Sequence, residues 1–280
     1  MVILIGLHMP ENIQKTSSTI RLLKIQKLFK RQHQISISDL ASMFNVSEMT
    51  IRRDLDKLER GGHVRRTTGG AMIAERMIFE FDFLARRQTN RKNKRAIAVE
   101  ASKLVQSSQR IIIDTGTTTL ELAQLLKNKD DITIITPSLA IASELQFCAN
   151  IQTILLGGIV RPSRADLTGA VTETTLDMFS VDIVFQGTDG IGLDGSIYNH
   201  DIRLVRVEQK MRLCAAHTYI LADSSKIGKT ALARGGSLPE LDALITDTKI
   251  SPAHYRALKD LGVNIILADV KGKNEKWRSL

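Results

Sequence analysis

The stretch VSEMTIRRDLDKLERGGHVRRTTGGA, residues Val46–Ala71, decides the fold of the N-terminal part of the chain. Ser47 is a residue type that caps helix N-termini. The apolar residues after it recur at the spacing of one helix face: Ile51, Leu55 and Leu58. Gly61-Gly62 ends this helix, and His63–Thr68 followed by two more glycines predicts a small hairpin. The stretch therefore indicates a capped helix followed by a β-hairpin.

Two more helices are predicted upstream of this stretch. The first is capped by Ser18 or Thr19, and the second starts near Ser38 and ends before Asn45. A short helix, a tight turn and a capped helix form a helix-turn-helix over Ile37–Glu59, whose second helix is suited to a DNA major groove. Together with the hairpin, residues 18–75 are predicted to be an α-rich helix-turn-helix domain.

The outward face of the capped helix supplies the candidate DNA contacts. Its N-terminal turns are placed for base edges, and its arginines for phosphates. The candidate residues are Ser47, Met49, Thr50, Arg52 and Arg53, with Arg65 and Arg66 on the hairpin. The alternative is that Ser47 is only a cap and the arginines only a solvated surface.

The charge distribution favours the DNA-binding interpretation. The formal net charge is +9, with 39 basic and 30 acidic residues. Residues 1–95 hold 19 of those basic and nine of those acidic residues, whereas residues 96–280 hold 20 and 21. A cationic domain is attracted to a polyanion such as double-stranded DNA.

The remaining composition excludes several classes of protein. Cys148 and Cys214 lie far apart without a CxxC spacing, which argues against a disulfide framework or a metal site and fits a reducing cytoplasm. Residues 1–17 are expected to be a flexible tail, since the apolar run at their start is too short to span a membrane. No cofactor and no membrane partner are expected.

The chain changes character after residue 95. Residues 76–95, rich in arginine, are expected to form a partly helical linker, and residues 96–280 a second domain. Short apolar runs typical of buried strands alternate there with amphipathic helices: 111–114, 132–135, 151–155, 183–186, 219–222, 243–246 and 264–267. This alternation predicts an α/β domain with a mainly parallel sheet.

Polar and glycine-rich loops follow the predicted strands. The DTGTTT segment, Asp114–Thr119, lies between a strand and a helix, where backbone N–H groups and hydroxyls can hold a phosphate. Ligands bind at the carboxyl ends of strands in open parallel sheets. The candidate effector residues are Asp114, Gly116, Thr117, Thr118, Thr119, Ser138, Gly157, Gly158, Arg161, Asp189 and Lys226. Each also has a plainer interpretation: the glycines as turns and Lys226 as surface charge.

Both halves resemble the DeoR family of bacterial transcriptional regulators. Residues 20–71, with the S-x-x-T-I-R-R-D-L core, are similar to its winged helix-turn-helix. The motifs D-x-G-T-T-T, L-G-G, F-x-G-x-D-G-I, A-D-S-S-K-x-G and L-D-x-L-I-T-D are similar to its C-terminal sensor domain. The resemblance implies a sensor fold like that of ribose-5-phosphate isomerase and a phosphorylated sugar or sugar acid as effector. It also implies a repressor acting on operator DNA. Because one recognition helix covers few base pairs and specificity needs two half-sites, a homo-oligomer, a dimer or tetramer, is expected.

The chain departs from the family pattern at one segment. Many members carry a Glu-Ala pair and then a Lys, seven and three positions before the methionine that corresponds to Met211. Here those positions hold Leu204 and Glu208, so the resemblance implies a differently charged cavity wall.

Two alternatives remain at the level of sequence. The first is a sugar-phosphate isomerase, which would need a general base and an electrophilic lysine near the Asp-Gly loop. Between Gly190 and Gln209 there is no lysine, and the one Glu is Glu208, which favours binding without turnover and no enzyme activity. The second is an activator in place of a repressor, which the sequence does not distinguish.

Overall fold

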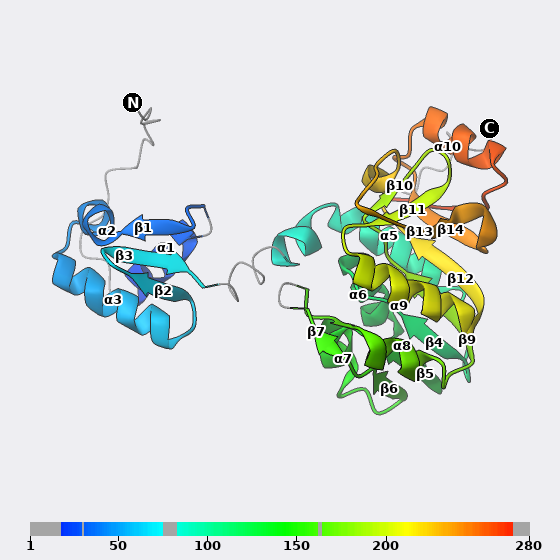
Figure 1. The fold of residues 1–280 in the computed structure, drawn as a ribbon, viewed down its shortest axis with the longest axis horizontal. Helices are drawn as coiled ribbons and strands as arrows, with labels where there is room; N and C mark the ends of the chain where they lie inside the picture. Colours follow the sequence, from blue (N-terminus) through cyan, green and yellow to red (C-terminus); the bar gives the residue numbers. More distant parts are fainter. Residues whose placement is uncertain (1–17, 30, 75–82, 162–163, 271–280) are drawn as a thin grey trace. The chain divides into compact units, whose positions relative to one another are not determined.

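The computed structural model describes residues 18–29, 31–161 without 75–82, and 164–270, in two compact units divided between Asp82 and Phe83 (Figure 1). The predicted tail, 1–17, lies outside the described residues, as does the first part of the predicted linker, 76–82. No helix in the described ranges is long and apolar enough to cross a membrane.

The first unit is a winged helix-turn-helix, as predicted. Its elements in chain order are α1 (Ser18–Phe29), β1 (Gln34–Ser36), α2 (Ile37–Phe44), α3 (Glu48–Arg60), β2 (Val64–Thr67) and β3 (Gly70–Ile73). The hairpin β2–β3 gains a third strand, β1, which pairs antiparallel with β3 and which the sequence did not indicate. At Gly70 a Cβ would lie 2.3 Å from the Ile35 carbonyl oxygen, so this pairing needs glycine.

A buried ion pair joins α1 to α3. The Arg21 Nε donates to Asp54 Oδ2 over 2.5 Å, and the Asp54 side chain is 3% exposed. Asp54 lies on the same helix face as Ile51, Leu55 and Leu58, which pack with α1 and α2 in one apolar core. Because a buried carboxylate is costly without a partner, this bond fixes α1 against α3.

The second unit is built on a seven-stranded, fully parallel sheet. Its strands are the seven predicted ones: β4 (Arg110–Ile113), β5 (Ile132–Thr136), β6 (Ile151–Leu155), β9 (Val181–Gln186), β12 (Ala215–Leu221), β14 (Ala243–Asp247) and β15 (Ile265–Ala268). Their order in the sheet is β15-β14-β12-β9-β4-β5-β6. The sheet therefore confirms the α/β class with a mainly parallel sheet.

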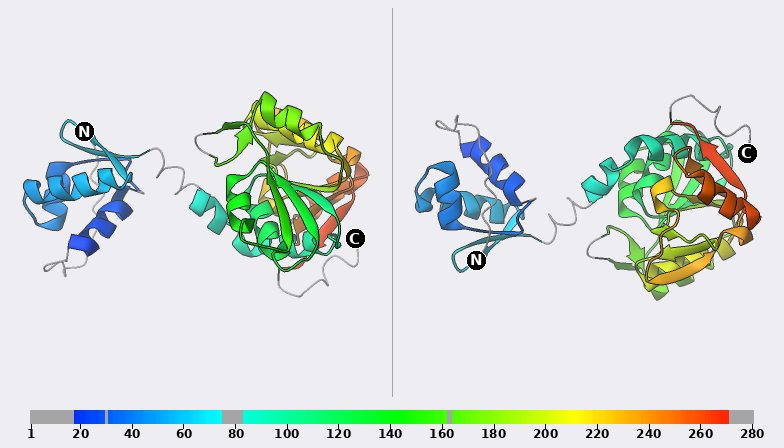
Figure 2. Two further views of the ribbon diagram at one scale, coloured as in Figure 1. Left: turned by 90° about the horizontal axis from the view of Figure 1, so that it is seen from below. Right: turned by 90° about the horizontal axis from the view of Figure 1, so that it is seen from above.

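Helices cover both faces of this sheet (Figure 2). The first face packs against α5 (Arg91–Ser102), α6 (Thr117–Leu126) and α7 (Leu139–Leu145), and the other against α8 (Ala170–Leu176), α9 (Ile202–Leu213) and α10 (Pro252–Asp260). On β4, Ile111 and Ile113 face the first core, while Ile112 faces the core beneath α8 and α9. The alternation explains why the strands read as continuous apolar runs.

Small elements surround the sheet and were not predicted. They are the β7 (Ile159–Val160) and β8 (Leu167–Thr168) ribbon, the three strands β10 (Gly190–Ile191), β11 (Ser196–Asn199) and β13 (Ala233–Ser237), and the short helices η1 (Ser224–Lys226) and η2 (Leu238–Glu240). Strands of two to five residues with turns between them carry too little periodicity to be detected in the sequence.

The segment 83–95, expected to belong to the linker, is part of the second unit. Residues 83–88 are helical, α5 begins at Arg91, and Asn93 and Lys94 are buried. The Lys94 ammonium donates to the Arg86 carbonyl oxygen over 2.5 Å. Because the segment carries many charges, its sequence did not indicate that one of its faces packs against the second unit.

The chain direction reverses across the sheet at β4 and β9. From β4 the chain continues to β5 and β6 on one side, and then returns to β9 on the other. In parallel sheets such a switch point leaves a crevice at the carboxyl ends of the strands, where ligands bind.

Candidate DNA-binding surface and ligand cavity

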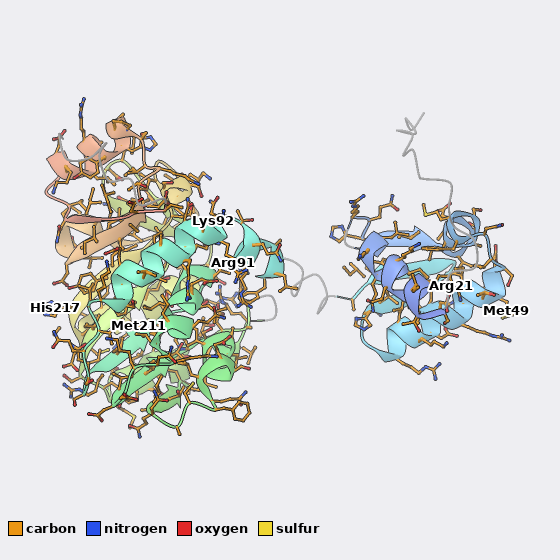
Figure 3. All side chains as sticks on the ribbon, turned by 180° about the vertical axis from the view of Figure 1, so that it is seen from behind. Arg21, Met49, Arg91, Lys92, Met211 and His217 are labelled. Carbon is orange, nitrogen blue, oxygen red and sulfur yellow. The ribbon has the colours of Figure 1, made fainter. Side chains whose placement is uncertain are left out.

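The N-terminus of α3 is capped as expected. The Ser47 hydroxyl accepts from the Thr50 N–H over 3.2 Å, and the two hydroxyls lie 3.0 Å apart. Met49 is 58% exposed and projects from the surface (Figure 3). The first turn of α3 thus presents Met49 and Thr50 on an ordered helix end.

Three of the four candidate arginines are exposed. Arg52 lies 3.7 Å from the Glu48 carboxylate in an ion pair between exposed side chains, which contributes little. Arg53 and Arg65 are exposed, and neither forms an ion pair with any described residue. These side chains are available to phosphates.

Arg66 is placed differently from the expectation. Its guanidinium pairs with the Asp56 carboxylate, and its backbone N–H donates to Glu59 Oε1 over 2.8 Å. Both acids belong to α3, so Arg66 fixes the wing against the helix. Nothing in its sequence context distinguished it from Arg65, since the distinction depends on which way β2 faces.

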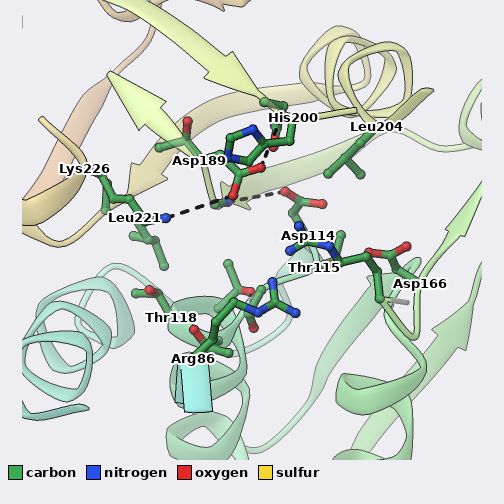
Figure 4. Close-up of a pocket in the computed structure, with 18 of the residues that line it drawn as sticks. Arg86, Asp114, Thr115, Thr118, Asp166, Asp189, His200, Leu204, Leu221 and Lys226 are labelled. Atoms are coloured by element: carbon green, nitrogen blue, oxygen red, sulfur yellow. Dashed lines mark hydrogen bonds and ion pairs between the residues drawn. The ribbon is translucent and has the colours of Figure 1, made fainter. Parts of the chain in front are cut away.

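A cavity of about 590 Å³ lies at the switch point between β4 and β9 (Figure 4). Nine of the candidate effector residues line it: Asp114, Gly116, Thr117, Thr118, Thr119, Ser138, Arg161, Asp189 and Lys226. The Asp114 carboxylate crosses the switch point and accepts from the Gly187 N–H over 3.3 Å. The parallel strands bring together loops that are distant in the sequence.

Gly157 and Gly158 do not line this cavity. Gly158 has φ +143°, and a Cβ there would lie 2.0 Å from Thr172 Oγ1 in α8. The Thr172 hydroxyl donates to the Gly157 carbonyl oxygen over 2.7 Å. These glycines let the backbone pass close to α8, which corresponds to their plainer interpretation as turns.

The N-terminus of α6 opens on the cavity. Its N-cap, Gly116, has φ +140° and offers no side chain, so no side chain caps the first turn. Thr118 faces the cavity, whereas the Thr119 hydroxyl donates to the Gly116 carbonyl oxygen over 3.0 Å. Uncapped N–H groups at a helix start favour an anion.

Arg161 is engaged by two carboxylates inside the protein. It is 6% exposed and donates to both oxygens of Asp166 over 2.6 and 2.5 Å, and to Asp201 over 3.0 Å. Asp201 also caps α9 and binds Arg203. Arg161 therefore holds the β7–β8 ribbon to α9, and most of its charge is balanced.

Other cavity residues were missed by the sequence analysis. Arg86, Asn90 and Lys94 line the cavity from the segment before and within α5. Burial lowers the pKa of the Lys94 ammonium, while Asp223 opposes that shift. The Lys226 ammonium lies 4.0 Å from Asp189, whose other oxygen accepts from the His200 N–H over 3.1 Å. Arg86, Asn90 and Lys94 were missed because a charged helical segment resembles a linker in the sequence.

Two buried carboxyls complete the wall. Burial raises the pKa of Asp114 to about 7, the Asp166 carboxylate adds to the shift, and the N–H groups of Thr115 and Gly187 oppose it. Burial also raises the pKa of Glu208 well above its ordinary range, and Asp114 adds to that shift. A cavity rich in lysine and arginine thus has an acidic inner wall.

Both units match known protein families. The DeoR-like helix-turn-helix domain family matches residues 21–77, and the DeoR C terminal sensor domain family matches residues 89–248. The chain belongs to the DeoR family. It is 34% identical over 242 residues to the uncharacterized HTH-type transcriptional regulator YulB of Bacillus subtilis. The aligned residues cover 86% of this chain and 93% of that protein.

A second relative of this DeoR-family protein is the glycerol-3-phosphate regulon repressor of Escherichia coli, 29% identical over 87% of this chain and 96% of that protein. These names describe transcriptional regulators, not enzymes, so the isomerase alternative is not supported. Ribose 5-phosphate isomerase from Methanocaldococcus jannaschii aligns with 49% of this chain and 55% of that chain, at 22% identity and a TM-score of 0.38.

The two kinds of arginine in the first unit should differ in salt dependence. Arg53→Ala removes a free cation, so the slope of log affinity for DNA against log salt should flatten by about one. Arg66→Ala should also weaken binding, but with a smaller change of slope, because Asp56 already neutralises Arg66. Fluorescence anisotropy with a DNA duplex across a salt series measures both, with the exposed Arg256→Ala of α10 as control. Equal slopes for the wild type and Arg53→Ala would contradict the assignment.

The raised pKa of Asp114 makes stability depend on pH. The carboxyl of Asp114 holds its proton more tightly in the folded protein than in the unfolded chain, where its pKa is near 3.8. The free energy of unfolding that Asp114 contributes therefore falls as the pH rises from about 4 to about 7. The loss amounts to about 4 kcal/mol if the full shift applies. Asp114→Asn should lack this fall in urea unfolding curves at pH 4.5, 6 and 7.5, whereas the exposed Asp260→Asn should follow the wild type. Parallel curves for wild type and Asp114→Asn would refute the shift.

Proposed function

We propose that this regulator is a repressor of a carbohydrate catabolic operon, released from its operator by a phosphorylated sugar or sugar acid bound in the cavity of the second unit. The observation that carries the proposal is the uncapped start of α6 at the switch-point cavity, which Lys94 and Lys226 also line. Backbone N–H groups at a helix start together with ammonium groups suit a phosphate.

The remaining cavity groups suit a hydroxylated ligand. In the proposed complex the N–H groups of Thr117–Thr119 and the Thr118 hydroxyl hold the phosphate, and Asp189 accepts from a sugar hydroxyl. Asp189 is partly exposed in the cavity and already has one oxygen engaged by the His200 N–H, which leaves the other for Lys226 and a ligand. The relative named a glycerol-3-phosphate regulon repressor supports a phosphorylated metabolite as the signal.

Ligand binding releases DNA only if the ligand favours one state of the protein over another. Arg86, Asn90 and Lys94 line the cavity and follow closely after Phe83, where the second unit begins. We place the coupling in this segment, because a ligand that contacts it changes the part of the second unit nearest in sequence to the DNA-binding unit.

The repressor is also proposed to act as a homo-oligomer, because one recognition helix reads few base pairs and two half-sites are needed for useful specificity. The expectation is a dimer or tetramer of the full chain in sedimentation velocity at micromolar concentration. A strict monomer, in the presence and absence of operator DNA, would contradict it.

A single hydroxyl tests the phosphate site. Thr118→Val keeps the side-chain shape and removes the hydroxyl, so operator binding should persist while the sugar phosphate needed for half-maximal release rises about tenfold. Thr174→Val, at an exposed position of α8, is the matched control. The measurement is operator release in an anisotropy titration with a panel of sugar phosphates. An unchanged half-maximal concentration for Thr118→Val would place the phosphate elsewhere.

A further inference from the structure

The inner wall of the cavity holds two carboxyls without a counter-ion. Asp114 directly follows β4 and is 1% exposed; Glu208 lies on α9 and is 2% exposed, and both line the cavity. Within the described residues, neither carboxyl has a lysine, arginine or histidine nitrogen within 4.0 Å. Buried carboxylates are ordinarily paired.

The hydrogen bonds of the two carboxyls leave one oxygen of Asp114 unsatisfied. Asp114 Oδ2 accepts from the Gly187 N–H over 3.3 Å, but Asp114 Oδ1 is buried and has no hydrogen-bond partner. Glu208 Oε1 accepts from the Asn199 side-chain amide over 2.5 Å. An acceptor that is left alone in a protein interior costs free energy, which a donor from a ligand can recover.

The nearby arginines are committed elsewhere. Arg161 is held by Asp166 and Asp201, and the Arg212 guanidinium donates to the Gly235 carbonyl oxygen over 2.6 Å. The cations that remain on the wall, Lys94 and Lys226, lie beside Asp223 or Asp189. Arg212 opposes the rise of the Glu208 pKa from beyond 4.0 Å, so a cation in direct contact with both carboxyls would have to come from a ligand.

We infer that the effector carries a protonated amine in addition to its phosphate, and that this amine donates to Asp114 and Glu208: the ligand is an amino sugar phosphate. The inference rests on the proposed function and names its ligand class. The phosphate at the start of α6 and the ammonium group at the acidic inner wall give the ligand one orientation, because its two charges meet opposite charges at the two ends.

Other occupants fit the inner wall less well. A metal ion is disfavoured because no group of three or more His, Cys, Asp or Glu side chains in the described ranges is placed to bind one. A sugar acid would set a third carboxylate against Asp114 and Glu208. A neutral sugar hydroxyl can donate to one carboxyl, but unlike an ammonium group it does not stabilise the ionised form of the pair.

The experiment compares sugar phosphates that differ at one substituent. Glucosamine 6-phosphate is compared with glucose 6-phosphate and with N-acetylglucosamine 6-phosphate, and the galacto series repeats the comparison in case the ring configuration matters. The full-length protein releases labelled operator DNA in an anisotropy titration. In at least one series, the free amine should act at a concentration about tenfold to a hundredfold lower than its hydroxyl and N-acetyl counterparts.

A matched variant links this preference to Glu208. Glu208→Gln keeps the shape and hydrogen-bonding capacity and removes the charge, so the preference for the amine should shrink severalfold while operator binding stays unchanged. Glu240→Gln, at an exposed glutamate of the same unit, is the control and should keep the full preference. Because Asn199 can still donate to the new amide oxygen, Glu208→Gln is expected to fold, which its operator binding reports.

The outcomes separate the two proposals. If hydroxyl or N-acetyl sugar phosphates, or a phosphorylated sugar acid, release DNA at concentrations equal to or lower than the amine, the amine inference is wrong and the proposed function stands. If no member of either series, nor of the wider sugar phosphate panel, releases DNA, the proposed function fails and the inference fails with it. An amine preference that survives in Glu208→Gln also overturns the assignment.

Discussion

The pairing of β4 with β9 is the constraint on which the second unit depends. These strands are neighbours although almost 70 residues separate them, and the chain leaves β4 in one direction and returns to β9 from the other. Because the chain leaves the two strands toward opposite sides, a crevice opens between their carboxyl ends. The loops after β4, β9 and β12 therefore converge there, which sets Asp114, Asp189 and Lys226 around one cavity.

The cavity's electrostatics follow from which charges are already paired. Its wall carries several basic residues, yet Arg161 is neutralised by Asp166 and Asp201, and Lys226 lies beside Asp189. Glu208 adds a buried acid to this wall. In the proposed complex, recognition depends on the buried carboxyls as much as on the cations.

Much of this arrangement could be predicted from the sequence, and the exceptions share one cause. Apolar runs identified all seven parallel strands, and the loops after them contained nine of the residues that line the cavity. The roles of Arg66, Arg161 and Gly158 were not predictable, because each depends on a tertiary neighbour: Asp56, Asp201 or Thr172. Asp54 did carry a signal, since its spacing of three from Ile51 puts a charge on the buried face of α3.

The apolar core and the ion pairs described for the first unit join its own elements. Its apolar core lies between Leu22 and Ala74, Arg21 is bound to Asp54, and Arg66 joins the wing to α3 through Asp56, so these contacts all close within about 55 residues. A module of this kind can be exchanged between genes by recombination near residue 82 without disturbing the cavity. The target sequence on the chromosome and the metabolite that is sensed can then evolve separately, and one sensor can be recruited to a new set of genes.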